Sequence, residues 1–261
     1  MRQAAQMKLA GNTVLITGGT SGIGFEFAAQ LLKRGNTVII TGRDQGRLEQ
    51  AQRSLPGLHA IESDVSDPKA IALLSDSVTR QFPALNVLIN NAGIMRTINL
   101  LDPPDGLEDI TREIETNLNG TVRMVKQFLP HLKTKERAAI VNVSSGLAFV
   151  PLPIAPIYCA AKAGVHSFTQ SLRVQLQNTA IKVFELAPPI TRTSLFTKDI
   201  HSEDVKGVRM MDVTQMVSQA IRGLEKDHLE IRPGPSNFLK WMSRIAPGIM
   251  LTTLSRVSNS K

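Results

Sequence analysis

Residues 12–24 read NTVLITGGTSGIG, and the fold of the chain is organised around this stretch. Its first half is an apolar run rich in β-branched residues, which predicts a buried parallel strand. Three glycines in the spacing GxxxGxG then allow the backbone to turn sharply into a helix. Such a turn binds phosphate at the positive end of a helix, although the same spacing also occurs in plain strand-to-helix connections. The residues expected to contact a phosphate here are Gly18, Ser21, Gly22, Ile23 and Gly24.

Length and composition limit the classes of protein to consider. The chain has 261 residues, a normal length for one large α/β domain with a sizeable core. Hydrophobic residues at 42% and charged residues at 20% are typical of globular proteins. The single cysteine, Cys159, excludes an intramolecular disulfide, and the five histidines lack ligand spacing, so we predict no metal site.

The single cysteine and the absence of a secretory signal in residues 1–11 favour a cytoplasmic protein. Residues 1–11 have no apolar core of a secretory signal and are predicted to be a short tail. The uncharged stretch 138–161 contains three prolines and several polar residues, so we interpret it as a strand and a loop. The net charge of +8 comes without a nucleic-acid motif, and we expect a solvated basic surface.

The end of the second predicted strand, 37–41, bears on cofactor choice. Enzymes that bind NAD usually carry a carboxylate at this place to hold the ribose hydroxyls. Here Gly42 is followed by Arg43, and a guanidinium binds phosphate through paired hydrogen bonds. The sequence therefore favours NADP over NAD. The alternative is a solvated arginine, with Asp44 turned inward instead.

Two further strands, 58–61 and 86–89, end in polar turns. The aspartate after the first is placed either to reach an adenine or to cap the next helix, and both readings remain open. The second leads into NNAG, where consecutive asparagines can tie neighbouring strands together and the glycine admits a cofactor. The expected cofactor contacts from these turns are Asp64, Val65, Asn91, Ala92 and Gly93.

A tyrosine and a lysine four residues apart are the strongest chemical signal. On a helix, Tyr158 and Lys162 lie on one face, one turn apart. Tyrosine has a pKa of about 10 and is a poor base at neutral pH, but a nearby ammonium favours the phenolate. The strand 139–143 delivers Ser144 and Ser145, and a serine hydroxyl there can donate to the same substrate oxygen.

Together these motifs resemble the short-chain dehydrogenase/reductase family. TGGTSGIG, NNAG, Asn117 in a helical segment, VSS and YCAAK stand in the family's order and spacing from Asn12 to about Arg232. The resemblance implies one α/β domain: a Rossmann-like, doubly wound parallel sheet of about seven strands with helices on both faces. It also implies that helices 107–133 and 157–177 pair across a two-fold axis in a homodimer or homotetramer.

The resemblance assigns a role to each of four residues. Ser145, thirteen residues before Tyr158, would polarise a substrate carbonyl. Tyr158 would act as general acid in reduction and base in oxidation. Lys162 would bind the nicotinamide ribose and lower the tyrosine pKa, and Asn117 would hold a water that relays protons. The implied reaction moves a hydride between NADP(H) and a carbonyl or secondary alcohol; the alternative is a non-catalytic dinucleotide sensor, which would need none of the four together.

The segment after the sixth strand departs from the family pattern. It reads LAPPITRTSLF, with Pro188 followed by Pro189 where the family usually has glycine, while Thr193 matches a cofactor-binding threonine. The proline pair resembles a bacterial subgroup that includes oxidoreductases linked to D-alanylation operons. Residues 194–212 occupy the place of a substrate lid. Their leucine, phenylalanine and methionines favour an apolar substrate pocket; the alternative is that these side chains pack on the core.

The segment 236–261 extends past the last family motif. Five apolar residues recur at helical spacing, Lys240 and Arg244 share another face, and Pro247 with Gly248 is predicted to end the helix. The apolar stripe must be buried somewhere. Packing over the substrate cleft or a partner subunit is favoured over docking on an anionic membrane, because a helix of about three turns offers little apolar area.

Overall fold

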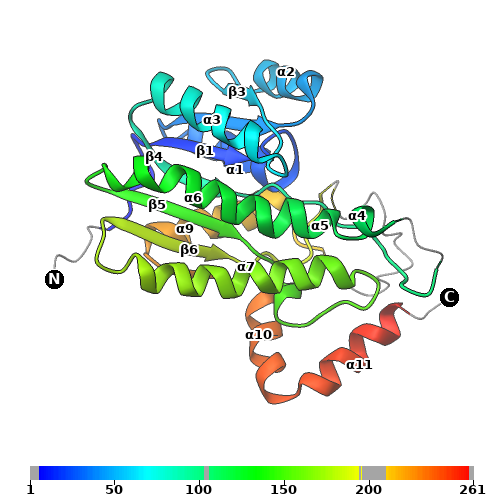
Figure 1. The fold of residues 1–261 in the computed structure, drawn as a ribbon. Coiled ribbons are helices and arrows are strands. Elements are labelled where there is room, and N and C mark those ends of the chain that lie inside the picture. Colours follow the sequence, from blue (N-terminus) through cyan, green and yellow to red (C-terminus); the bar gives the residue numbers. More distant parts are fainter. Residues whose placement is uncertain (1–5, 103–105, 194, 196–209, 259–261) are drawn as a thin grey trace.

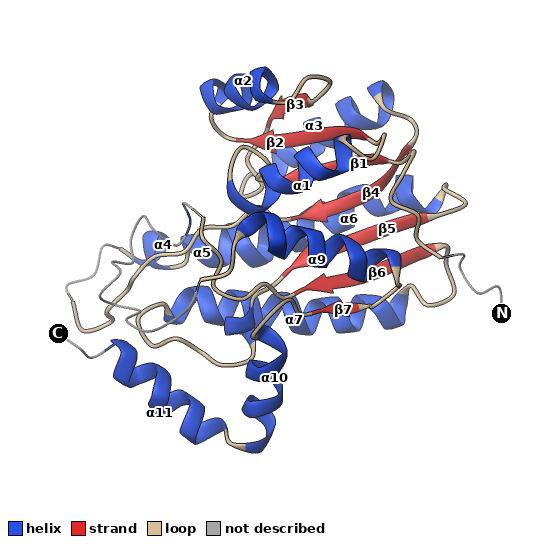
Figure 2. Ribbon diagram, turned by 180° about the vertical axis from the view of Figure 1, so that it is seen from behind, coloured by secondary structure: helices blue, strands red, loops and turns tan. Residues whose placement is uncertain are grey.

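The computed structural model describes residues 6–102, 106–193, 195 and 210–258. Its centre is a parallel sheet of seven strands in the order β3-β2-β1-β4-β5-β6-β7, with helices on both faces (Figures 1 and 2). The order reverses between β1 and β4, as in a doubly wound sheet. The predicted Rossmann-like, single-domain fold is confirmed.

The strands predicted at 37–41, 58–61, 86–89 and 139–143 are found within one residue of these bounds. In chain order the strands are β1 (Thr13–Thr17), β2 (Thr37–Gly42), β3 (His59–Glu62), β4 (Leu85–Asn90), β5 (Ala138–Val143), β6 (Ile181–Leu186) and β7 (Glu230–Ile231). The helices are α1 (Gly22–Leu32), α2 (Gln45–Ser54), α3 (Pro68–Gln81), α4 (Leu107–Ile110), α5 (Arg112–Ile114), α6 (Gly120–Lys133), α7 (Pro156–Gln175), α9 (Val213–Glu225), α10 (Ser236–Ile245) and α11 (Pro247–Ser258).

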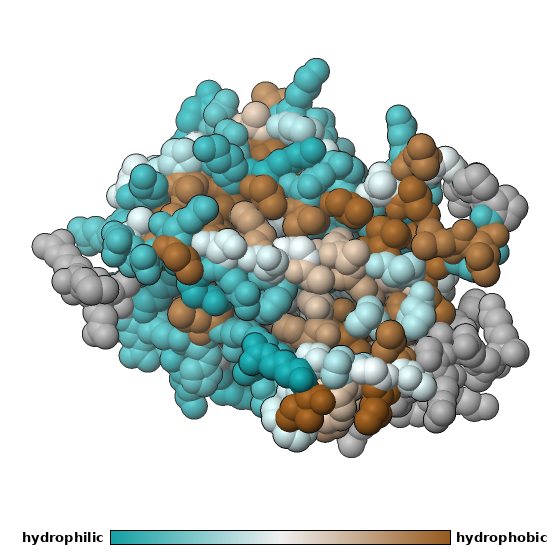
Figure 3. All heavy atoms as spheres, turned by 60° about the horizontal axis from the view of Figure 1, so that its bottom comes forward, coloured by the Kyte–Doolittle hydropathy of each residue, from teal (hydrophilic) through white to brown (hydrophobic). Residues whose placement is uncertain are grey.

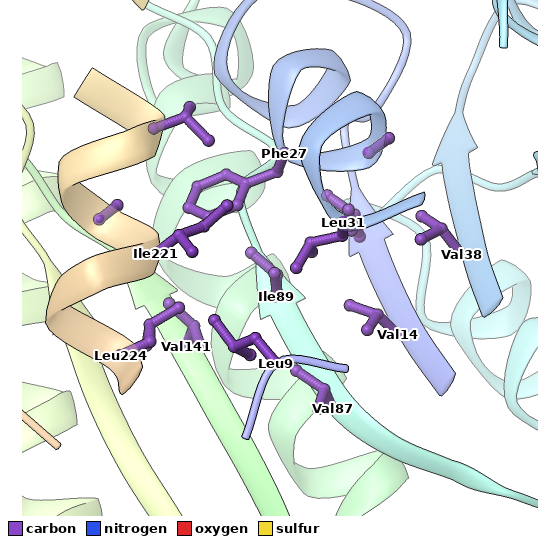
Figure 4. Packing of buried hydrophobic residues seen from close by; sticks show 14 of the residues in the cluster. Leu9, Val14, Phe27, Leu31, Val38, Val87, Ile89, Val141, Ile221 and Leu224 are labelled. Atoms are coloured by element: carbon purple, nitrogen blue, oxygen red, sulfur yellow. The ribbon is translucent and has the colours of Figure 1, made fainter. Parts of the chain in front are cut away.

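The alternation of side chains along the strands builds a core on each face of the sheet. Val14 and Ile16 pack with α1 and α9, whereas Leu15, between them, packs with α3, α6 and α7. Figure 4 shows the first of these cores, where Phe27 and Ile221 meet over the sheet. Because both faces are covered, the central strands β1 and β4 are buried and largely apolar, which explains the continuous apolar runs in the sequence.

The helix predicted over 107–133 is broken. The chain forms α4, turns at Thr111 into α5, and widens into a π-helical turn at Glu115–Asn119 before α6 begins. A π turn inserts an extra residue per turn and is frequent at functional sites. Here it contains Asn117, which the sequence placed inside a regular helix.

The C-terminal segment corrects another expectation. Pro247 ends α10 as predicted, but it also begins a second helix, α11. On α10, Phe238, Trp241 and Ile245 are 56%, 59% and 60% exposed. These three residues of the predicted apolar stripe therefore do not pack over the described part of the chain, whereas Leu239 and Met242 are half-buried. Figure 3 shows hydrophobic side chains on the face that carries these helices.

The inner face of α10 carries a lysine instead. Lys240, expected to share a face with Arg244 away from the apolar stripe, is 7% exposed and forms an ion pair with Glu230 of β7. Its ammonium also lies 5.2 Å from the centroid of the Phe149 ring. Leu239 faces Gly146, in the turn after β5. This pairing turns the apolar stripe outward, because a buried ammonium requires a counter-charge that β7 supplies.

Within the described residues, no helix combines the length and the hydropathy needed to cross a membrane.

The close packing of α1 on the glycine turn generates a stability prediction. A Cβ built on Gly24 would lie 2.4 Å from the carbonyl oxygen of Gly18 and 2.5 Å from Asn91 Nδ2. Gly24→Ala is therefore expected to lower the free energy of unfolding by about 1–3 kcal/mol, measured by urea denaturation. Gly46→Ala is the control, since its Cβ meets nothing closer than 3.4 Å in exposed α2; it should stabilise by up to about 1 kcal/mol. Equal effects would contradict this account.

Candidate active site

A cleft of about 580 Å³ lies along the carboxyl ends of the strands. It runs from Arg43 and Asp64, past the glycine turn, to Tyr158. This is the position outside the switch point at which doubly wound sheets bind ligands. The predicted site residues that line it are Gly18, Ser21, Gly22, Ile23, Arg43, Asp64, Val65, Asn91, Ala92, Gly93, Ser145, Tyr158, Lys162, Pro188 and Thr193.

Two predicted site residues do not line the cleft. Gly24 packs against the backbone of Gly18. Its lack of a side chain therefore lets helix α1 come close to the glycine turn, and it does not make room for a cofactor. Asn117 lies behind the cleft wall, fully buried. The sequence could not separate residues that touch a ligand from residues one layer behind them.

The glycine turn has the geometry of a phosphate-binding loop. Gly18 and Gly22 have φ angles of 64° and 56°, in the left-handed region that favours glycine. The N-cap residue of α1, Ser21, makes no side-chain capping bond. The first N–H groups of α1 therefore face the cleft without a side-chain acceptor at the cap, which suits an anionic group.

Arginines and an aspartate border the end of the cleft near β2. An Arg43 guanidinium nitrogen lies 3.7 Å from Asp64 Oδ2. Asp64 Oδ1 accepts hydrogen bonds from the N–H and hydroxyl of Ser66, so this carboxylate both borders the cleft and closes the turn before α3. Asp44 also borders the cleft, but its Oδ1 accepts the N–H of Arg47 as the cap of α2. The inward carboxylate in this region is therefore Asp64 beside Arg43.

The asparagines of NNAG tie strands together as predicted. Asn90 Nδ2 donates to Asn142 Oδ1 at 2.9 Å, which joins the ends of β4 and β5. Asn91 Nδ2 donates to the carbonyl oxygens of Thr17 and Gly18, both at 3.0 Å. These bonds hold β4 and β5 together and fasten the glycine turn to the end of β4.

The two serines after β5 face different partners. Ser144 Oγ donates to the buried Glu185 carboxylate at 2.5 Å, which occupies this hydroxyl. Ser145 Oγ accepts the N–H of Leu147 at 3.1 Å and shares a hydrogen bond with the side chain of Tyr158. The structure thus brings together Ser145 and Tyr158, the pair that the spacing predicted.

Burial controls the ionisation of the tyrosine and the lysine. It raises the pKa of Tyr158 to about 12, and the Ser145 hydrogen bond only partly opposes this. It lowers the pKa of Lys162 to about 8. The expected depression of the tyrosine pKa is therefore not found. Removal from water disfavours both charged forms, and the Lys162 ammonium donates to the carbonyl of Val143 at 2.8 Å.

Asn117 fastens the loop that follows NNAG. Its Oδ1 accepts the N–H of Ile94 and its Nδ2 donates to the carbonyl of Ile94, both at 2.8 Å. A Cβ built on Gly93 would lie 3.1 Å from Asn117 Oδ1 and 3.5 Å from Lys162 Nζ. Glycine therefore allows the side chains of Asn117 and Lys162 to come close to the same point.

The proline pair shapes the loop opposite the glycine turn. The carbonyl of Pro188 accepts the N–H of Gly146 at 2.8 Å, and the carbonyl of Pro189 accepts the hydroxyl of Thr191 at 2.8 Å. Thr193 lies against the glycine turn, 3.2 Å from a Cβ built on Gly22. The loop thus closes over the cleft without a glycine at 189. The predicted lid, 194–212, lies largely outside the described residues.

An apolar cluster surrounds the tyrosine on the substrate side. Its buried members are Met95, Leu147, Leu152, Ala155, Tyr158 and Cys159, with Ile154, Ile190, Leu195 and Met210 packed against them. Burial raises the pKa of the Cys159 thiol to about 11, so this thiol is an inert packing group. Among the described residues, no group of three or more His, Cys, Asp or Glu side chains is placed to hold a metal ion.

Several cleft residues were missed by the sequence analysis, among them Arg47, Met95 and Ile190. Arg47 carried a usable signal, since it stands one helical turn after Arg43, at the start of the helix that follows the second strand. Met95 and Ile190 carried none, because an apolar residue in a loop is equally consistent with core packing.

Comparison with known proteins agrees with this geometry. The short chain dehydrogenase family model matches residues 12–204. The uncharacterized oxidoreductase DltE of Bacillus subtilis is 43% identical over 86% of this chain and 89% of its own. A short chain dehydrogenase from Burkholderia cenocepacia, solved with NADP, is 25% identical with a TM-score of 0.81 over 95% of this chain and 99% of that chain. A Burkholderia phymatum enzyme of the same fold, solved with NAD, is 21% identical with a TM-score of 0.80 over 91% of this chain and 93% of that chain. The chain therefore belongs to the short-chain dehydrogenase/reductase family and is an NAD(P)-dependent oxidoreductase.

Proposed function

We propose that this enzyme transfers a hydride between NADP(H) and the carbonyl or secondary alcohol of a small apolar substrate, in the cytoplasm. The observation that carries the proposal is the arrangement of one cleft. Ser145, Tyr158 and Lys162 converge at an end lined by apolar side chains, and Arg43 borders the opposite end. The described side chains packed around Tyr158 are apolar, which suits an apolar substrate.

The chain's residues suit the two ends of a dinucleotide differently. The glycine turn would hold the pyrophosphate, and Arg43, with Arg47 nearby, would bind a 2′-phosphate. Asp64 beside Arg43 holds that guanidinium at the cleft. Lys162 would donate a hydrogen bond to the nicotinamide ribose. This bond would orient the nicotinamide ring, which gives or accepts the hydride. Similar enzymes have been solved with NADP and with NAD, and Arg43 favours NADP here.

Proton transfer falls to Tyr158. Because its pKa is raised to about 12, the phenol is protonated at neutral pH and ready to protonate a carbonyl oxygen during reduction. The Ser145 hydroxyl donates to the same oxygen and polarises it. Lys162, whose pKa is lowered to about 8, exchanges protons near neutral pH. Asn117, behind Gly93, would hold a water molecule that returns a proton to this lysine.

The first prediction tests the cofactor. Arg43→Ala should weaken NADPH binding by about 1.5 kcal/mol, roughly tenfold in Kd, the low end for a charge-assisted hydrogen bond because the side chain is exposed. NADH binding should change little. Arg53→Ala, on α2 and paired with Glu49 outside the cleft, is the control. Equal losses for both cofactors in a fluorescence titration would contradict the NADP assignment.

The second prediction tests the chemistry. A screen of NADPH oxidation across apolar ketones and aldehydes should find a substrate. With that substrate, Tyr158→Phe should lower kcat by about 10²–10⁴-fold, the range for general acid catalysis, because only the proton donor is lost. NADPH affinity should be preserved. A variant that kept more than about a tenth of kcat would rule out this role for Tyr158.

The third prediction concerns association, which we propose produces a homodimer or homotetramer. The helices α6 and α7 lie side by side on one face (Figure 1), and Val174 of α7 is 64% exposed. The stripe on α10 is then buried by a partner subunit in preference to an anionic membrane. Light scattering at micromolar concentration should give a dimer or tetramer. A monomer that sediments with anionic vesicles would contradict both assignments.

A further inference from the structure

The turn that carries Ser145 depends on packing from other segments. Residues 145–149, which we call the serine turn, follow β5 and contain a single turn of 3₁₀ helix at Gly146–Ala148. Such a turn has poorer hydrogen-bond geometry than an α-helix. The N–H of Gly146 donates to the carbonyl of Pro188 at 2.8 Å, which ties one point of the serine turn to the loop after β6. The orientation of the Ser145 hydroxyl therefore depends also on the side chains that pack against this turn.

Helix α10 packs directly on the serine turn. A Cβ built on Gly146 would lie 3.0 Å from Ser236 Oγ and 3.1 Å from Leu239 Cδ1, so the lack of a side chain at this position lets α10 come close. Ser236 has no exposed surface, and Lys240, one helical turn further on, is nearly buried. The inner face of the C-terminal extension thus covers the serine turn, while its outer face is exposed.

The ring of Phe149, the last residue of the serine turn, contacts two helices. His166 of α7 meets it edge to face, with the ring centroids 5.1 Å apart. The Lys240 ammonium of α10 lies 5.2 Å from its centroid, within the range of a cation–π interaction. The position of this ring, and with it the end of the serine turn, is therefore set by α7 and α10 together.

Both partners of this ring are anchored on carboxylates of the sheet. Glu185 of β6 and Glu230 of β7 are register partners in adjacent parallel strands. His166 Nδ1 lies 2.7 Å from Glu185 Oε2, and Glu185 also accepts the hydroxyl of Ser144. The Lys240 ammonium donates to both carboxylate oxygens of Glu230. Because two carboxylates on neighbouring strands repel each other, a cation is favoured here, and Lys240 supplies one.

We propose that Lys240 is a positioning residue of the active site. Its ammonium, held by Glu230, fixes the ring of Phe149 and thereby the turn that presents Ser145 to the substrate carbonyl. Lys240 acts from outside the cleft, because it does not belong to the cleft lining. The effect on turnover rests on the proposed carbonyl reduction, whereas the effect on the serine turn can be measured without a substrate.

Hydrogen exchange tests the step from Lys240 to the serine turn. Lys240→Met keeps an unbranched side chain and removes the ammonium, while Arg232 stays 3.3 Å from Glu230 as a partner for this carboxylate. Exchange in a peptide covering residues 144–150 should become about three- to tenfold faster, the factor that corresponds to losing a partly buried cation–π contact. Exchange in β5 should stay unchanged, because its hydrogen bonds lie in the centre of the sheet.

A matched control lies one turn further along α10. Arg244→Met also replaces a cationic side chain of this helix by methionine, but Arg244 is exposed, so its exchange pattern should match that of the unmodified protein. Unchanged exchange at 144–150 in Lys240→Met, or equal acceleration in both variants, would overturn the proposal. If Lys240→Met does not fold, Phe149→Leu removes the other half of the contact and should accelerate exchange by the same factor.

Steady-state kinetics with the best ketone of the screen test the step from the serine turn to catalysis. Lys240→Met should lower kcat about tenfold, less than the roughly 10²–10³-fold cost of removing a polarising donor outright, because Ser145 is displaced and not lost. The KM and the Kd for NADPH should not change, since the cofactor end of the cleft is untouched. Arg244→Met should leave all three values unchanged.

A double variant separates positioning from a general loss of structure. Lys240→Met combined with Phe149→Leu should be no slower than the slower single variant, because both substitutions remove one contact. Additive losses in kcat, or a matching loss of NADPH affinity, would overturn the positioning role. A failure to find any ketone or aldehyde substrate would contradict the proposed function, whereas hydrogen exchange would still decide whether Lys240 holds the serine turn.

Discussion

The side chain of Asn91 makes the tie on which the whole site depends. It donates to the carbonyl oxygens of Thr17 and Gly18, where β1 ends and the glycine turn begins. The hydroxyl of Thr17 in return accepts the N–H groups of Asn91 and Ala92. These bonds join β1 and β4 at the point where the strand order reverses, and backbone groups there would otherwise be unpaired. They hold the glycine turn and the end of β4 in one frame.

Burial is the second constraint, and it determines the protonation states of the site. The same packing that excludes water around Tyr158 raises its pKa and lowers that of Lys162. The pKa values of the two groups would lie close together in water, and burial moves them apart, up for the tyrosine and down for the lysine. In this environment the tyrosine is suited first to giving a proton.

The broken helix from α4 to α6 shows how local irregularity serves the site. A regular helix would place residues 113 and 117 one turn apart on the same face. In the structure a π-helical turn at Glu115–Asn119 follows residue 113, and the side chains of Asn117 and Glu113 accept the N–H groups of Ile94 and Arg96 in the loop after β4. The free-energy cost of the wider turn is offset by the hydrogen bonds that Asn117 and Glu113 make with the backbone of Ile94 and Arg96.

The sequence by itself determined the parallel sheet, the glycine turn, the asparagine ties and the residues that line most of the cleft, because each follows from local periodicity or from a motif of fixed spacing. Only the tertiary structure decided which residues touch the cleft and which stand behind it, as Gly24 and Asn117 show. It also decided the direction of the tyrosine pKa and the burial of Lys240 against Glu230. These properties depend on how much water and which charges distant segments bring to a side chain, and spacing along the chain does not contain that information.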